Sequence, residues 1–196
     1  MTLASRFIRS PEGVAGLLLL LLLTGAAVLA PLLFPGDPLS IVGKPLLRPF
    51  AQPGLPLGTD RLGRDVLAEL FHGARTSLIV GVSAAVVAIL AGALIGTLAG
   101  FGGGLIDEAL MRVVDAFQIV PGFLLALAFV SVVGPSLSVV VIAIALGAWT
   151  GPARLARAEV LSIRERDFVA SARVIGMHPM EIALKEVLPL ALEERW

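Results

Sequence analysis

The sequence has no cysteine and only two histidines, His72 and His178. Without thiols there is no disulfide framework, no thiolate nucleophile and no zinc or iron–sulfur site built on cysteine, and two histidines are too few for a histidine-rich metal site. Charge is scarce as well: charged residues make up 15% of the 196 residues, and 15 Lys and Arg balance 15 Asp and Glu. That balance gives no reason to expect nucleic acid as a partner.

Apolar residues, by contrast, are abundant. They make up 57% of the chain, and the mean hydropathy is +0.95. Soluble domains are about half apolar and a quarter charged, while disordered chains are charged and poor in apolar residues. The composition therefore excludes disorder, disfavours a soluble protein and predicts an all-α, polytopic helical membrane protein.

Three stretches carry no charge: residues 14–34, 76–106 and 116–153. A membrane-spanning helix needs about 20 apolar residues, so the third stretch is too long for one helix. Gly134-Pro135 is expected to divide it, because proline breaks the helical hydrogen-bond ladder. The sequence thus predicts four transmembrane helices, over residues 14–34, 78–99, 116–133 and 136–153.

Arg6 and Arg9 precede the first apolar stretch, as basic residues precede the core of a secretory signal peptide. Such cores are about 7–15 residues long and end at an A-x-A-like site. This stretch is longer, and Ala27-Val28-Leu29-Ala30 is a poor cleavage site. We expect a retained first span, with cleavage as the alternative.

The distribution of basic residues predicts the orientation. With the N-terminus inside, the outer segment between the first two spans holds five of the 15 Lys and Arg, and the inner segments hold the rest. Positive residues favour the cytoplasmic side, so both ends are predicted to be cytoplasmic. The five outer residues are Lys44, Arg48, Arg61, Arg64 and Arg75.

The segment after the first span is rich in proline, which predicts an extended external loop over residues 35–57. Asp65 to Phe71 is predicted to form a short amphipathic helix at the membrane surface. The expected organisation is a cytoplasmic N-terminus at 1–13, a first transmembrane helix at 14–34, an external loop with an interfacial helix at 35–75, a membrane core at 76–189 that includes a cytoplasmic loop at 157–189, and a tail at 190–196.

Small residues recur at every fourth position of the second span. Such a stripe allows another helix to approach backbone to backbone; the alternative is the general tolerance of glycine in membrane helices. We expect a packing face, with its partner either in this chain or in another subunit. The residues are Ala84, Ala88, Gly92, Gly96 and Gly100.

Charged residues lead into the third span, where Glu108 and Arg112 are four residues apart and Arg112 and Asp115 three apart. Charges at a helix entrance are usually solvated, but Asp115 is expected to lie deeper, and charge inside a bilayer marks a pathway or gate. Pro121 should kink the helix just beyond it. Arg112, Asp115 and Pro121 are therefore the gate or pathway candidates.

The charged tail predicts a cytoplasmic helix-turn-helix. Ser162-Ile163-Arg164-Glu165 has the form of a capping box that starts a helix, Gly176 suits the helix end, and Pro179 suits the first turn of a second helix. The alternative is an amphipathic hairpin at the interface with no partner. No phosphate-binding loop, nucleophile elbow or zinc-protease motif occurs, so no catalytic or metal-binding residue is expected.

Three stretches carry a family resemblance: residues 57–78, which include Leu57-Gly58-Thr59-Asp60-Arg61-Leu62-Gly63-Arg64-Asp65, residues 103–122, and residues 168–189. Together they resemble permease subunits of binding-protein-dependent ABC importers of the dipeptide, oligopeptide and nickel class, with a type I transmembrane domain. The third is similar to that family's "EAA" cytoplasmic loop, in which a Glu-Ala-Ala run, a later glycine and a Leu-Pro pair keep fixed spacing.

The resemblance implies a permease of the cell inner membrane that imports peptides, nickel or similar small solutes by alternating access. Its implied partners are a second permease subunit, an external solute-binding protein, the lipid bilayer and cytoplasmic ATPases, which bind the ATP, so that the chain needs no cofactor of its own. The ATPases would dock on the helix-turn-helix. The implied coupling residues are Phe168, Ala170, Ser171, Ala172, Gly176, Leu188 and Pro189.

Two departures from the family pattern affect these expectations. Ala170 stands where the family has its leading Glu, and Ser171 stands at its first Ala. The family also has two further spans after the loop, whereas this chain ends seven residues beyond Pro189. We therefore expect a C-terminally truncated permease. The alternative is a non-transporting membrane remnant or interaction protein that retains the ATPase-docking loop.

Overall fold

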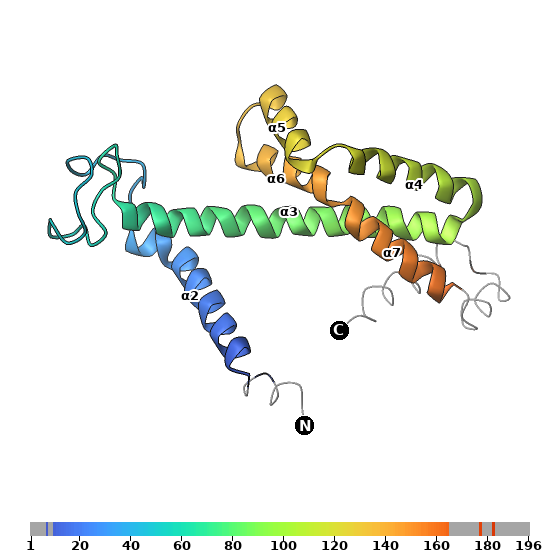
Figure 1. The fold of residues 1–196 in the computed structure, drawn as a ribbon, viewed down its shortest axis with the longest axis horizontal. Coiled ribbons are helices and arrows are strands. Elements are labelled where there is room, and N and C mark those ends of the chain that lie inside the picture. Colours follow the sequence, from blue (N-terminus) through green and yellow to red (C-terminus); the bar gives the residue numbers. More distant parts are fainter. Residues whose placement is uncertain (1–6, 8–9, 165–176, 178–181, 183–196) are drawn as a thin grey trace. The chain divides into compact units, whose positions relative to one another are not determined.

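The computed structural model describes residues 7, 10–164, 177 and 182. In this part of the chain there are six α-helices and no strand, only two isolated β-bridges (Figure 1). The predicted all-α fold is thereby confirmed. The chain divides into two compact units, residues 1–79 and 80–196, each of which is described by itself.

The first unit begins with α2, Pro11–Leu33, which starts with proline in its first turn. Proline suits that position because its missing N–H would have no partner there. Only Ala27 and Ala30 of this helix are buried, and its run of leucines is exposed. An exposed apolar surface of this length is typical of a helix that faces lipid.

Helix α3, Val66–Gly102, is continuous over 37 residues. The separate interfacial helix predicted at Asp65 to Phe71 is therefore wrong, because residues 66–71 form the first turns of α3. Asp65 stands just before the helix and its carboxylate accepts a hydrogen bond from the Leu67 N–H at 2.9 Å, which caps it. At 1.5 Å per residue α3 is about 55 Å long, well beyond the ~30 Å of a bilayer core.

In the second unit the predicted third span is bent. Helix α4, Gly104–Ile119, and α5, Gly122–Val133, meet at 85° on either side of Pro121. A single helix over residues 116–133 is therefore wrong, although the predicted bend at Pro121 is confirmed. Gly134, with φ of +98°, ends α5, which confirms the predicted break at Gly134-Pro135.

The predicted fourth span is bent as well, into α6, Leu137–Ala148, and α7, Thr150–Ile163, at 47°. The prediction of a single helix over 136–153 took no account of Pro152. Proline has no N–H to donate to the carbonyl of Ala148, and its ring clashes with that carbonyl. Helix α7 also runs through Ser162, so the expectation that a helix starts there was wrong. Within the part of the chain that the structure describes, two helices, α2 and α3, are long and apolar enough to span a membrane, and the number rises to as many as four if each bent pair is one span.

Candidate functional site

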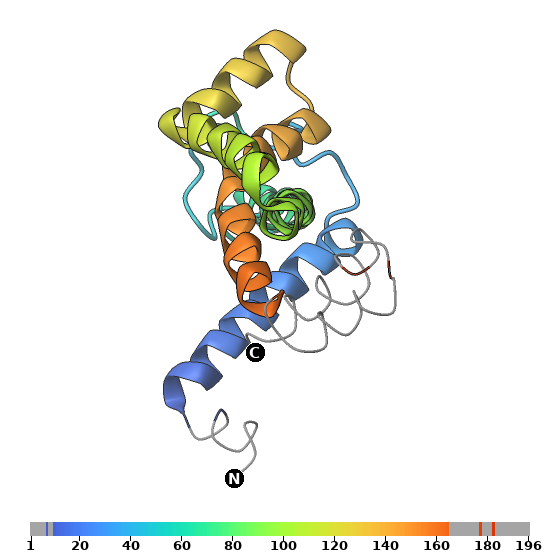
Figure 2. The ribbon, with the colours of Figure 1, turned by 90° about the vertical axis from the view of Figure 1, so that its right-hand side faces the viewer.

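Helix α7 lies against the glycine face of α3 in backbone contact. A Cβ atom added at Gly92 would lie 2.7 Å from Pro152 Cβ, and one at Gly100 would lie 2.9 Å from Val160 Cγ1. One at Gly96 would overlap the Ala153 carbonyl oxygen. Figure 2 looks along α3 and shows α7 passing beside it. Any side chain at these glycines would push the helices apart.

An apolar cluster joins α7 to α3, α4 and α6. Trp149, between α6 and α7, stacks edge-on against Phe117 of α4, with ring centroids 5.4 Å apart. Ala88 of the small-residue stripe belongs to this cluster. The cluster thus sits beside both helix breaks, and its buried members are Ala88, Val114, Ala145, Trp149 and Ala153.

Two arginines of α7 bind two aspartates of α4. Arg157 donates from Nε and Nη2 to the two carboxylate oxygens of Asp107 at 2.5 and 2.6 Å. The Asp107 side chain is only 16% exposed. Arg154, which lies about one helical turn before Arg157 on α7, forms an ion pair with Asp115 of α4. Fork-like arginine–carboxylate pairing adds geometric specificity to the attraction, so α4 and α7 are fixed in register.

The three gate or pathway candidates have different surroundings in the structure. Arg112 pairs with Glu108 at 3.2 Å, and both side chains are well exposed. Asp115 forms its ion pair with Arg154, and not with Arg112, the partner that their spacing of three residues suggested. Pro121 precedes α5 as its N-cap residue. Asp107, Arg154 and Arg157 were not among the predicted site residues. The signal available in the sequence was an acidic residue just before the predicted third span and basic residues just after the predicted fourth span.

The ends of α3 and α7 are joined by one further arginine. Arg164, just after α7, donates from Nη1 to the carbonyl oxygen of Gly100 at 2.8 Å. Gly103 makes room for it: its φ is +62°, and an added Cβ would lie 3.3 Å from Arg164 Nη1. The guanidinium group therefore satisfies a carbonyl that has no partner within the last turn of α3.

Beyond Arg164 the structure describes two residues, Met177 and Ile182. Ile182 is fully buried in a cluster with Val160 and Ile163, and Met177 and Phe101 pack against that cluster. The predicted coupling residues lie outside the described residues, so their roles stay predictions. They are Phe168, Ala170, Ser171, Ala172, Gly176, Leu188 and Pro189.

In the first unit, the segment before α3 is folded onto itself by Thr59. This side chain is buried, donates to the Lys44 carbonyl at 2.6 Å and accepts from the Leu47 N–H at 2.9 Å. Gly58 and Gly63 have φ of +75° and +82°, and a Cβ on either would collide with a backbone carbonyl. This explains why the segment needs glycine on both sides of its turn.

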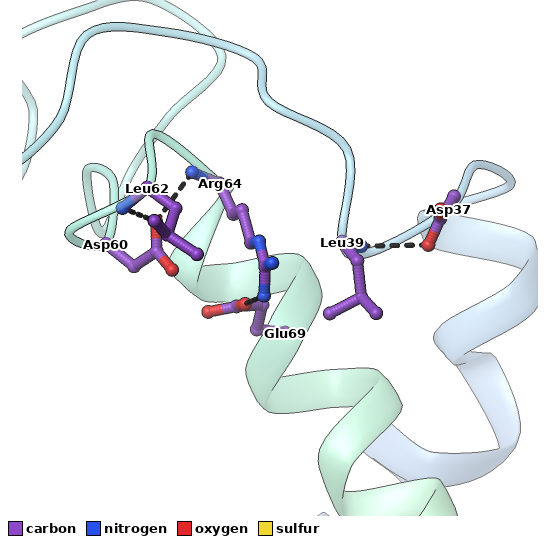
Figure 3. A network of polar contacts seen from close by, with 6 residues as sticks. All are labelled: Asp37, Leu39, Asp60, Leu62, Arg64 and Glu69. Carbon is purple, nitrogen blue, oxygen red and sulfur yellow. Dashed lines mark hydrogen bonds and ion pairs between the residues drawn. The ribbon is translucent and has the colours of Figure 1, made fainter.

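Asp60 closes that turn. Its Oδ1 accepts from the N–H groups of Leu62 and Arg64, both at 2.8 Å, and the Arg64 guanidinium lies 3.6 Å from Glu69 (Figure 3). The bond from the Arg64 N–H is the main cause that holds the pKa of Asp60 below its ordinary value. The charged form of Asp60 is therefore part of the turn.

The described residues contain no group of three or more His, Cys, Asp or Glu side chains that could hold a metal ion. A groove of about 510 Å³ between α5 and α6 is lined by apolar residues and glycine, among them Phe123, Leu127 and Gly147. None of the described residues that line this groove can act as an acid, base or nucleophile.

Comparison with known proteins places the sequence in a family. Residues 92–193, just over half of the chain, match the family described as "binding-protein-dependent transport system inner membrane component". The match covers the end of α3, helices α4 to α7 and the segment after them.

Named relatives cover more of the chain. It is 38% identical over 188 residues to the di/tripeptide transport system permease protein DppC of Pseudomonas aeruginosa, covering 93% of this chain and 62% of the relative. It is 35% identical over 186 residues to the dipeptide transport system permease protein DppC of Bacillus subtilis, covering 94% and 57%. The oligopeptide transport system permease protein OppC of B. subtilis is 34% identical over 135 residues, covering 69% and 44%.

The chain thus spans about three fifths of the length of the first two relatives. The family match and the named relatives together confirm the resemblance inferred from residues 57–189, and the apolar helices agree with it. The chain belongs to the inner-membrane permease components of binding-protein-dependent transport systems, which is a transport family and not a family of enzymes.

Proposed function

We propose that the chain is the membrane-spanning permease part of an ATP-driven importer of peptides. The observation that carries this proposal is the family match over residues 92–193 together with relatives named for dipeptides and oligopeptides. Those names favour peptides over nickel within the class that the sequence resembles.

Its proposed partners are a second permease subunit, cytoplasmic ATPases and an external solute-binding protein. The name of the family supports the last of these directly, because its transport systems depend on a binding protein. The proposed orientation has the N-terminus in the cytoplasm, which the distribution of Lys and Arg supports. The turn between α3 and α4 at Gly103 and the end of α7 then lie on the cytoplasmic side.

The arrangement of the second unit suits a part that moves as a body. The glycine contact, the Asp107–Arg157 pair and the Trp149 cluster hold the end of α3, α4 and α7 together. Pro121 sets α5 off from α4 by a bend of 85°, while α6, which meets α7 at 47°, stays attached to this body through Ala145 of the cluster. Packed helices with defined bends change position as rigid segments rather than by gradual deformation. Alternating access needs such segments on either side of a substrate path.

The test is removal of the gene for this chain from its own host, followed by uptake measurements with a labelled dipeptide and with radioactive nickel. Dipeptide uptake should fall and return when the gene is restored, while nickel uptake stays unchanged. Unchanged dipeptide uptake in the deletion strain, under conditions where the gene is expressed, would contradict the proposed substrate class. Loss of nickel uptake alone would favour the nickel branch of the class instead.

A further inference from the structure

The first unit contains an apolar groove of about 500 Å³ between α2 and the first turns of α3. On α3 this α2–α3 groove is lined by Leu70, Phe71 and Ala74, and on α2 by leucines and small residues between Leu21 and Leu33. No charged side chain belongs to the lining. The groove therefore suits an apolar group and has nothing in its walls to bind a polar one.

The contact that joins the two helices lies at one end of the α2–α3 groove. Phe34, just after α2, stacks edge-on against Phe71 with ring centroids 5.2 Å apart. His72 donates from Nε2 to the Phe34 carbonyl oxygen at 3.1 Å. The uncharged stretch of α2 ends at Phe34, and that of α3 begins at Thr76. This end of the groove is therefore expected at the edge of the hydrocarbon core, on the side of the segment 35–65.

A cation lies next to the same end of the groove. Arg75 follows Ala74 directly and comes four residues after Phe71, so it lies on the same face of α3 as Phe71, about one turn further along. Its side chain is exposed, and it makes no hydrogen bond or ion pair within the described part of the chain. Arg64 in the same unit, by contrast, is paired with Glu69. A long arginine side chain at this depth can reach the headgroups while its stem stays in apolar surroundings.

We propose that the α2–α3 groove and Arg75 together bind one phospholipid from the leaflet on the side of the segment 35–65. An acyl chain lies in the groove between the two helices, and the phosphate accepts hydrogen bonds from the Arg75 guanidinium. Guanidinium groups match the geometry of phosphate with two parallel hydrogen bonds. The chain fills a gap between two spans by close packing. The inference does not depend on which solute the permease carries.

Size and charge favour a phospholipid over another helix as the occupant. An α-helix with its side chains is about 10 Å across, so a groove of this volume takes only about one turn of one. A second copy of α2 would also bring no anion to Arg75, because its acidic residue, Glu12, is in the first turn, at the opposite end from Phe34. A phospholipid supplies both the slender apolar chain and the negative charge.

The test is binding of phosphatidylglycerol to the purified 196-residue chain, delipidated in detergent and followed by native mass spectrometry. The unchanged chain should retain one molecule at low lipid concentration. Arg75→Gln should weaken binding about tenfold, as expected for the loss of charge-assisted hydrogen bonds, and Arg75→Lys should be intermediate. Arg61→Gln removes another exposed arginine of the same unit and is the matched control, which should bind as the unchanged chain does.

A second variant and a second lipid separate the two halves of the site. Ala74→Phe places a bulky side chain in the groove and should weaken binding although Arg75 is intact. Diacylglycerol has no phosphate, so it should bind the unchanged chain and Arg75→Gln equally weakly. Inorganic phosphate at the same concentration as the lipid should not displace phosphatidylglycerol, because it has no chain to place in the groove.

Three results would overturn the lipid site. The first is equal affinity of Arg75→Gln and the unchanged chain for phosphatidylglycerol, and the second is displacement of the lipid by inorganic phosphate, which would leave an anion site alone. The third is a dimer of the unchanged chain that Ala74→Phe dissociates, which would assign the groove to a second copy. If Ala74→Phe does not fold, Leu29→Phe on the opposite wall takes its place, and undiminished lipid binding in that variant would contradict the position of the acyl chain.

Discussion

Arg157 and Asp107, which are 50 residues apart in the sequence, face each other with two parallel hydrogen bonds of 2.5 and 2.6 Å. The pair joins the second turn of α7 to the first turn of α4. Because each partner would be left with unsatisfied, partly buried polar atoms if the other were removed, the pair is more sensitive to mutation than an exposed ion pair.

We therefore expect Asp107→Asn and Arg157→Gln each to lower the free energy of unfolding by about 1–3 kcal/mol. The measurement is thermal unfolding of the purified chain in detergent. Glu108→Gln is the matched control, since the Glu108–Arg112 pair on the same helix is well exposed and should be worth less than about 1 kcal/mol. Arg157→Lys should recover part of the loss but not the second hydrogen bond. Equal effects at Asp107 and Glu108 would contradict the assignment.

The contact between α3 and α7 predicts a strong size limit at Gly96. Gly96→Leu should prevent the close approach, because even a Cβ there overlaps the Ala153 carbonyl. Leu94→Ala, at a half-exposed site of the same helix, should be milder. Folded yield in detergent compares the two variants. Equal yields would mean that the glycine face contacts lipid in the membrane rather than α7.

The proposed orientation can be tested by labelling, since a chain without cysteine gives no background reaction. A cysteine replacing Gln52 should react with an impermeant thiol reagent in intact cells, and a cysteine replacing Arg166 should not. The reason is that positive residues favour the cytoplasmic side, which places residues 35–75 outside. The reverse labelling pattern would overturn the orientation.

The proposed docking loop gives a prediction at Gly176, where a helix end is expected to need positive φ. A β-branched residue in that conformation costs roughly 1–2 kcal/mol of local strain. Gly176→Val should leave membrane insertion intact and weaken co-purification of the cognate ATPase. Gly16→Val, in α2 at a site with nothing within 4 Å of an added Cβ, serves as the control. Undiminished ATPase binding in Gly176→Val would remove Gly176 from the docking turn.

The turn at Asp60 should depend on pH. Its pKa is lowered in the folded turn, so the carboxylate's contribution is fully present above the ordinary aspartate pKa of about 3.9 and is lost as pH falls through the lowered value. Asp60→Asn should remove this dependence. Protease cleavage within residues 35–65, followed from pH 7 down to about pH 3 with an acid-stable protease, should rise for the original chain and be high and flat for Asp60→Asn. A pH profile shared by both chains would contradict the role of this carboxylate.

Composition and uncharged stretches were sufficient to predict the all-α membrane fold, the first span and the breaks at Pro121 and Gly134. The bend at Trp149 was missed because the reasoning followed charge, which is absent from 116 to 153, and gave no weight to Pro152. The start of α3 was misjudged for a related reason: charges at Glu69 and Arg75 end an apolar stretch but do not end a helix.

The site was harder to predict than the fold. Spacing of three and four residues identifies pairs within one helix, such as Glu108 and Arg112, and the structure retains that pair. The pairs of α4 with α7 depend on the register of two separate helices, which no local pattern contains. The burial of Ile182 likewise depends on its contacts with Val160 and Ile163, residues about 20 positions earlier in the chain. Both are consequences of tertiary packing.

The glycine face of α3 has a consequence for the gene itself. Every single-base change of a glycine codon that alters the residue introduces a Cβ atom, and at Gly92, Gly96 and Gly100 that atom already meets α7. These three codons therefore have no nearby neutral substitution, not even alanine. Gly81, on the same helix with open space around it, should vary more readily in populations, so that natural variation alone distinguishes the two kinds of glycine.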